Sequence, residues 1–194
     1  MTTDPADLLA RTTEAPLSDI QRDLDALGRA RVSTETSARA LRNAGSETGF
    51  EGASGEAASD ACLNVANKLV ACVDKIQAVA VAGNAARGAL EIAREDYAAL
   101  PSTEMPHTLS QYLYNVRSTA PDASVSLEGI GTVPAAQAES LWLAERKRQR
   151  DAAAAAALAR LQATMDTAAA DLSDPRVIVD MEVGTLRVGA SPRA

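Results

Sequence analysis

The sequence predicts an all-α protein, an elongated antiparallel helical hairpin extended to a three- or four-helix bundle, with a short C-terminal β-hairpin or arm. Aromatic residues make up only 3% of the chain although 46% of it is apolar, and this alanine-rich composition suits closely packed helices. One apolar heptad stripe runs without a slip from Gly52 to Leu100. A glycine-rich break at residues 46–55 separates it from an earlier helical pattern, as in a helical hairpin.

The stretch from Gly52 to Leu100 is expected to form one helix about 70 Å long, too long for a compact core to surround. Its first half carries a second apolar stripe beside the first, so we expect it to contact helices on two sides. The residues expected to bind a partner there are Leu69, Val70, Val73 and Ile76. The first stripe comprises Ala58, Cys62, Val65, Leu69, Cys72, Ile76, Val79, Gly83, Ala86, Leu90, Ala93 and Tyr97, and the second Leu63, Ala66, Val70, Val73, Ala80 and Val81.

A preceding helix is expected to begin at Pro16 and to end at a C-cap formed by residues 43–45. Residues 1–16 are polar and are expected to be frayed, unless Leu8 and Leu9 dock a short helical turn. The three-four spacing of this helix is continuous, but the residues in the middle of its stripe are polar. The helix is therefore expected to be a weaker packing partner than the long helix. Its stripe comprises Leu17, Ile20, Leu24, Leu27, Arg31, Thr34, Ala38 and Leu41.

The turn between the two helices contains Phe50, the only phenylalanine of the chain, followed by Glu51 and Gly52. Phe50 is expected either to cap the tip of the hairpin or to fill a partner's pocket. The arrangement of helix, Phe50-Glu51-Gly52 turn and alanine-rich helix resembles the WXG and LXG families of type VII secretion proteins. In those families a Trp-x-Gly turn joins two antiparallel helices, and the hairpins pair into four-helix dimers. The resemblance covers about residues 16–100.

The resemblance implies a secretion substrate, targeting module or partner that acts by helix-bundle pairing with itself or with a small helical protein. It places Phe50 and Gly52 in the partner-binding region, together with the broad face of the long helix. The family's export signal, a tyrosine followed four residues later by Asp or Glu, does not occur after Tyr97, Tyr112 or Tyr114. Either a partner supplies the signal, or the chain is not itself recognised. The rival interpretation is a cytoplasmic coiled-coil adaptor without a secretion role.

Beyond this hairpin, which with its N-terminus spans residues 1–100, residues 101–134 are expected to be a Pro- and Gly-containing linker. Two helical turns are expected within it, at residues 109–116. Residues 135–174 are expected to form a third long helix that packs on the hairpin and is anchored there by Trp142. Residues 175–194 are expected to form a short β-hairpin or an extended arm, because apolar side chains alternate at Val177, Val179, Met181 and Val183 and resume after Gly184.

Composition limits the remaining function classes. A net charge of −7 disfavours nucleic-acid binding, and the basic run at residues 146–150 is interpreted as a solvated face or a complement to acidic helices. No apolar run is long and uninterrupted enough for a membrane span, and no secretory leader is recognisable, so we expect a cytoplasmic protein that is exported, if at all, without a cleaved signal peptide. Cys62 and Cys72 are interpreted as core residues. The single histidine, His107, lacks ligand spacing, and no catalytic, metal or cofactor motif is found, so we expect a non-enzyme.

Overall fold

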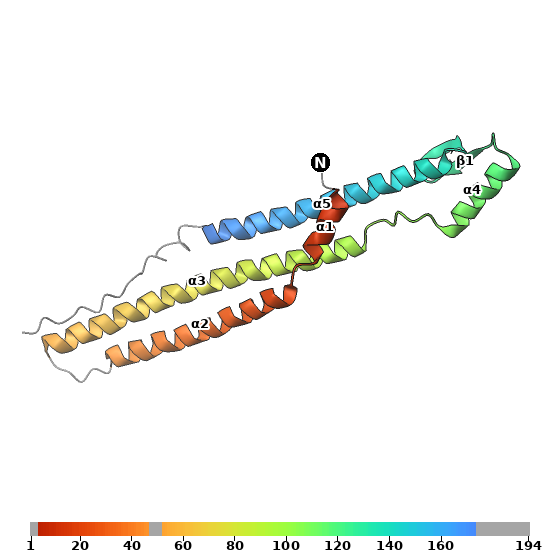
Figure 1. Ribbon diagram of the computed structural model, residues 1–194. Helices are drawn as coiled ribbons and strands as arrows, with labels where there is room; N and C mark the ends of the chain where they lie inside the picture. Colours follow the sequence, from red (N-terminus) through yellow and green to blue (C-terminus); the bar gives the residue numbers. More distant parts are fainter. Residues whose placement is uncertain (1–3, 47–51, 174–194) are drawn as a thin grey trace, which may run out of the picture. The chain divides into compact units, whose positions relative to one another are not determined.

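The computed structural model describes residues 4–46 and 52–173 and divides the chain into two compact units (Figure 1). Unit 1 comprises residues 1–15 and 88–163, and unit 2 comprises residues 16–87 and 164–194. The expected all-α fold class is confirmed. The elements are α1 (Pro5–Thr13), α2 (Leu17–Ser46), α3 (Ala53–Ala98), α4 (His107–Thr119), β1 (Ser124–Leu127), β2 (Gly131–Pro134) and α5 (Ala138–Ser173).

Unit 2 contains the helical hairpin of α2 and the first part of α3, which lie side by side in antiparallel directions (Figure 1). The register of the two helices is constant along their length: in each facing pair, the two residue numbers add to nearly the same sum. The facing pairs are Gly45 with Cys62, Arg42 with Asn67, Arg31 with Gln77 and Leu24 with Gly83. The stripe predicted for α2 therefore faces α3, and its polar middle is accommodated because Arg31 donates a 2.8 Å hydrogen bond to Gln77.

Gly45 does not form the predicted C-cap. It lies inside α2, which continues to Ser46, and it is buried against α3. A Cβ atom at this position would lie 3.2 Å from the Cβ atom of Cys62 and 3.3 Å from the carbonyl oxygen of Ser59. The Ser59 hydroxyl also donates a 2.6 Å hydrogen bond to the Gly45 carbonyl. The missing side chain thus permits the close approach of two helices.

This role predicts opposite effects for two glycines of the same helix. Gly28 lies in the interior of α2, where an added Cβ atom would enter open space, so Gly28→Ala should stabilise unit 2 by about 0.5–1 kcal/mol. Gly45→Val should destabilise it by about 1–3 kcal/mol, because the added methyl groups overpack the contact with Cys62. Urea denaturation followed by circular dichroism measures both. A gain for Gly45→Ala equal to that of Gly28→Ala would contradict the close approach.

One core of unit 1 joins α4, the β-hairpin and the start of α5. Val125 and Leu127 alternate with exposed serines along β1 and are buried together with Leu113 of α4. The antiparallel register runs from Ser124 opposite Pro134 to Leu127 opposite Gly131, and both Gly129 in the turn and Gly131 at the start of β2 have positive φ. This hairpin lies in the stretch predicted to be a linker, and α4 extends the two helical turns predicted there. The predicted C-terminal arm lies outside the described residues.

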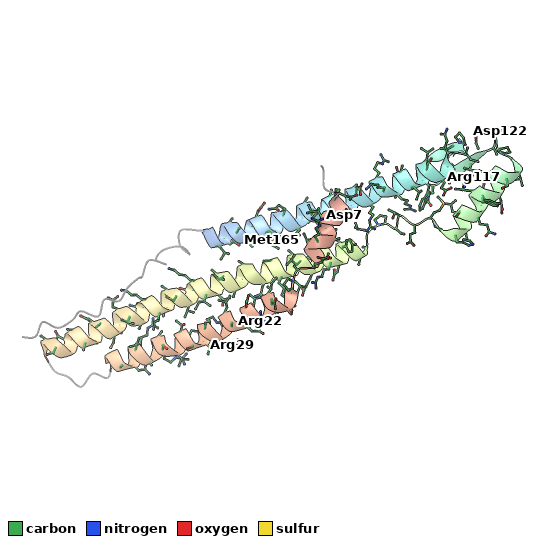
Figure 2. All side chains as sticks on the ribbon, in the orientation of Figure 1. Asp7, Arg22, Arg29, Arg117, Asp122 and Met165 are labelled. Carbon is green, nitrogen blue, oxygen red and sulfur yellow. The ribbon has the colours of Figure 1, made fainter. Side chains whose placement is uncertain are left out.

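Trp142 belongs to this core, and its expected role as the anchor of α5 on the α2–α3 hairpin stays a prediction. Its neighbours in the core are Leu113, Val125, Leu127, Ala135 and Ala138. Trp142 lies near the start of α5, shortly after the β-hairpin, and its ring is buried in this local core. The guanidinium of Arg146, one turn later, stacks 5.2 Å from the ring centroid. Arg117 of α4, labelled in Figure 2, donates a 2.8 Å hydrogen bond to Glu139 of α5, which connects the same elements.

The second core of unit 1 joins α1, the last turns of α3 and the middle of α5. Leu9 is fully buried among Ala93, Ala154 and Ala157, so the predicted third helix packs on the end of α3. The side chain of Asp4 caps α1 by accepting a 3.0 Å hydrogen bond from the backbone of Ala6. The N-terminal segment is therefore a docked helix from Pro5 onward, through Leu9 as the sequence allowed, and not a frayed segment.

Arg94 of α3 holds the other end of α1. Its guanidinium donates hydrogen bonds of 2.9 and 2.7 Å to the carbonyl oxygens of Thr13 and Ala15. Carbonyl groups at a helix C-terminus lack partners within the helix and carry partial negative charge, so a cation there is favourable. Both ends of α1 are thus fixed by side-chain hydrogen bonds.

Candidate protein-interaction surface

The candidate surface is the part of α3 that its pairing with α2 leaves uncovered. The less exposed side chains of this part of α3 are spaced three and four residues apart: Ala66 is fully buried, and Leu69, Val73 and Ile76 are half-buried. This spacing lies between the two apolar stripes predicted for the helix. Because α2 covers only the boundary between the stripes, one apolar flank remains on each side of the pair.

The predicted partner-binding residues do not form one exposed patch. Leu69 and Ile76 are half-buried beside α2, whereas Val70 and Val73 line a shallow groove bordered by Glu35, Arg39 and Arg42 of α2. Gly52 is exposed and has a φ of +92°, a conformation that favours glycine. It precedes α3 by one residue and lies more than four turns from Val70. Phe50 lies outside the described residues.

The first flank is the more continuous apolar surface. Val65, Cys72 and Val79 recur every seven residues, and all three are exposed, Val65 by 47% and Val79 by 40%. Residues seven apart lie on the same face of a paired helix. We call these three residues the outer stripe. They were counted in the heptad pattern, but sequence reasoning did not place them in the site, because it could not decide which part of the two stripes α2 would cover.

The second flank lies on the opposite side of the α2–α3 pair. Leu63 and Val81 are 40% and 55% exposed and are eighteen residues apart, which is five full turns of an α-helix. Between them on this side the polar Gln77 binds Arg31 and Val70 lies in the groove. The second flank is thus interrupted by polar contacts, and the outer stripe is the better candidate for pairing with another helix.

The chemical groups of the described residues offer no alternative site on α3. Cys62 and Cys72 are both free thiols, and the described part of the chain contains no group of three potential metal-ligating side chains. By its length and composition alone, α3 is long and apolar enough to cross a membrane, although Lys68, Asp74 and Lys75 interrupt its apolar surface. The absence of a membrane span therefore stays a prediction.

The basic run of α5 is engaged in intramolecular contacts. Lys147 forms ion pairs with Asp4, the N-cap of α1, and with Asp151, and Arg150 donates a 3.1 Å hydrogen bond to the carbonyl oxygen of Pro101. The hydrogen bond from Lys147 holds the pKa of Asp4 below its usual value, with a further contribution from the Ala6 amide, while Asp4 raises the pKa of Lys147. These contacts match the interpretation of the run as a complement to acidic residues of the same chain.

Comparison of the chain with family models, with curated proteins and with solved structures finds no match. The resemblance to the WXG and LXG families therefore depends on the residues of the turn and the two helices alone, and the secretion role stays a prediction.

Proposed function

We propose that the protein is a helical interaction module in which the outer stripe of α3 pairs with a helix of a partner protein. The observation that carries the proposal is the heptad repetition of exposed apolar side chains at Val65, Cys72 and Val79. Apolar residues repeated at this spacing are the pattern by which helices associate lengthwise. Scattered exposed apolar residues would need no explanation, but a row aligned on one helix does.

The process we propose for this module is type VII secretion, as a substrate, targeting module or partner. Support comes from the antiparallel pairing of α2 with α3 and from the exposed, positive-φ Gly52 just before α3, both of which agree with the WXG-like interpretation of the turn. A cytoplasmic adaptor would use the same surface without being exported. Detection of the protein in culture medium, dependent on the secretion machinery, separates the two functions.

The test of pairing uses two matched double variants. Val65→Glu with Val79→Glu should lower the affinity for the cognate partner by at least about a hundredfold, because the complex would bury two carboxylates in an apolar contact. Leu63→Glu with Val81→Glu changes equally exposed residues on the second flank and should leave the complex intact. Light scattering of the purified protein, alone and with the products of neighbouring genes, measures the complex.

All four valine and leucine positions are exposed, so both variants should retain the helical content and melting temperature of the wild type. A complex that survives in the first variant, or that is lost equally in both, would contradict the assignment of the outer stripe. A wild-type protein that stays monomeric with every neighbour would contradict the function itself.

A further inference from the structure

The shallow groove between α2 and α3, which we call the α2–α3 groove, combines an apolar lining with arginine side chains. Its apolar lining consists of Ala38, which is buried, and of Val70 and Val73, which are half-buried. Arg39 and Arg42 of α2 border the groove and are exposed. Its volume is about 270 Å³, slightly below the roughly 300–1,000 Å³ of small-molecule pockets. The groove therefore has room for a few side chains of a peptide segment.

The two arginines of the groove have charge to spare for an acidic ligand. Arg39 forms no hydrogen bond or ion pair with any other residue that the structure describes. Arg42 donates one long hydrogen bond of 3.5 Å to Asn67, and a guanidinium group has five N–H donors. Glu35 is the only acidic residue that lines the groove, and its carboxylate lies 3.7 Å from the guanidinium of Arg31. The groove therefore fits a segment that carries both apolar side chains and carboxylates.

The segment that follows α5 has a sequence of this kind. Residues 177–183 are Val-Ile-Val-Asp-Met-Glu-Val, and they belong to unit 2, as the groove does. In the extended conformation predicted for this segment, the side chains of Asp180 and Glu182 would lie on one side, about 7 Å apart. The Cβ atoms of Arg39 and Arg42, three residues apart on a helix, are separated by roughly 5–6 Å. The spacing of the two carboxylates thus matches the spacing of the two arginines.

The size of the groove favours a segment of the same chain over a separate protein. Seven residues line the groove, whereas each side of a stable protein–protein interface contains about 20–30 residues. Only three residues separate residues 177–183 from the end of α5 at Ser173. A segment tethered by so short a connection has an effective concentration on the order of millimolar. A weak contact is therefore sufficient for docking within the chain.

We propose that residues 177–183 dock in the α2–α3 groove as an extended segment. The carboxylates of Asp180 and Glu182 pair with the two arginines at the rim. Val179 and Met181, which alternate with these acidic residues, pack on the apolar lining. The two valines of the groove, which the sequence predicted to bind a partner, are then covered by the chain itself. The outer stripe lies on the other flank of α3 and stays open, so this inference does not depend on the proposed function.

The test is a charge exchange in the full chain, followed by amide hydrogen exchange of residues 177–183. Each rate is compared with the intrinsic rate of the same sequence. Asp180→Lys with Glu182→Lys should lower the protection of these amides by at least about tenfold, because two attractive charge pairs become repulsive. Arg39→Glu with Arg42→Glu should have the same effect. The variant that combines all four substitutions restores opposite charges and should regain most of the wild-type protection.

A charge reversal elsewhere on α2 serves as the control. Arg22 and Arg29 lie on α2 and are exposed (Figure 2), so Arg22→Glu with Arg29→Glu changes the net charge by the same amount as the substitutions in the groove. It should leave the protection of residues 177–183 unchanged, and an equal loss in this control would overturn the proposal. The amides of α2 report whether a variant has unfolded. If the groove variant unfolds, the lysine variant of the segment still decides, because it changes no residue of the helices.

Other results would also overturn the proposal. Exchange of residues 177–183 at their intrinsic rates in the wild type would show that the segment does not dock. If Arg39→Glu with Arg42→Glu then weakens the complex with the cognate partner by at least about tenfold, the groove binds that partner. If the same variant instead dissociates a wild-type dimer, the groove binds a second copy. Protection that this variant leaves unchanged would place the segment outside the groove.

Discussion

Trp142→Ala should lower the free energy of local unfolding of α4 and the β-hairpin by about 3–5 kcal/mol, the range for removing a buried tryptophan. The indole ring is almost fully buried in a core that also contains side chains of α4 and β1, so its removal leaves a cavity that no single element can close. A two-stranded hairpin is marginal by itself and depends on such a contact for its stability. Amide hydrogen exchange of residues 107–142 measures the loss.

Two controls separate the ring from its surroundings. Trp142→Phe keeps an aromatic ring in the core and should cost less than about 1.5 kcal/mol. Leu141→Ala changes the adjacent residue of α5, which is partly exposed, and should change stability by less than about 0.5 kcal/mol. Amides of α2 should exchange at the wild-type rate in all three variants. Faster exchange in α2 would instead support the original prediction that Trp142 anchors α5 to the α2–α3 hairpin.

The hairpin of α2 and α3 could be predicted from the sequence because its information is local and periodic. A stripe repeated every three and four residues from Leu17 to Leu41 admits only one buried face for α2, and in the structure this is the face that is buried at Ala38 and half-buried elsewhere. The predicted long helix, residues 52–100, differs from α3 by one or two residues at each end. The role of Gly45 was predicted wrongly because a glycine near the end of a helix is typical of a C-cap. Its close approach to Cys62 depends on α3 and cannot be recognised from the sequence of α2.

The β-hairpin was missed because its prolines and glycines were interpreted as a linker. The alternation of Val125, Leu127 and Val133 around Gly129 and Gly131 is a hairpin signal, but each strand has only four residues. Strands this short are defined by what covers them, here Leu113 and Trp142. The candidate site was predicted only in part for a similar reason. Two adjacent apolar stripes show that α3 has more apolar surface than one helix can cover, but they do not show that α2 covers only the boundary between them.

Leu9→Ala should release α1 from unit 1 with a cost of about 2–5 kcal/mol, because a fully buried leucine leaves a cavity among Ala93, Ala154 and Ala157. The adjacent residue supplies the control, since Leu8 is 43% exposed and Leu8→Ala should cost less than about 0.5 kcal/mol. Hydrogen exchange of the α1 amides measures both effects.

The result also distinguishes apolar packing from the polar contacts at the ends of α1. Arg94 binds the carbonyl oxygens of Thr13 and Ala15, and Lys147 binds Asp4, but both contacts are partly exposed to solvent and compete with water. If packing of Leu9 dominates, Leu9→Ala should abolish the protection of α1 while Arg94→Ala only reduces it. If Arg94→Ala has the larger effect, the hydrogen bonds to the helix C-terminus hold α1, and the alanine-lined contact with Leu9 is secondary.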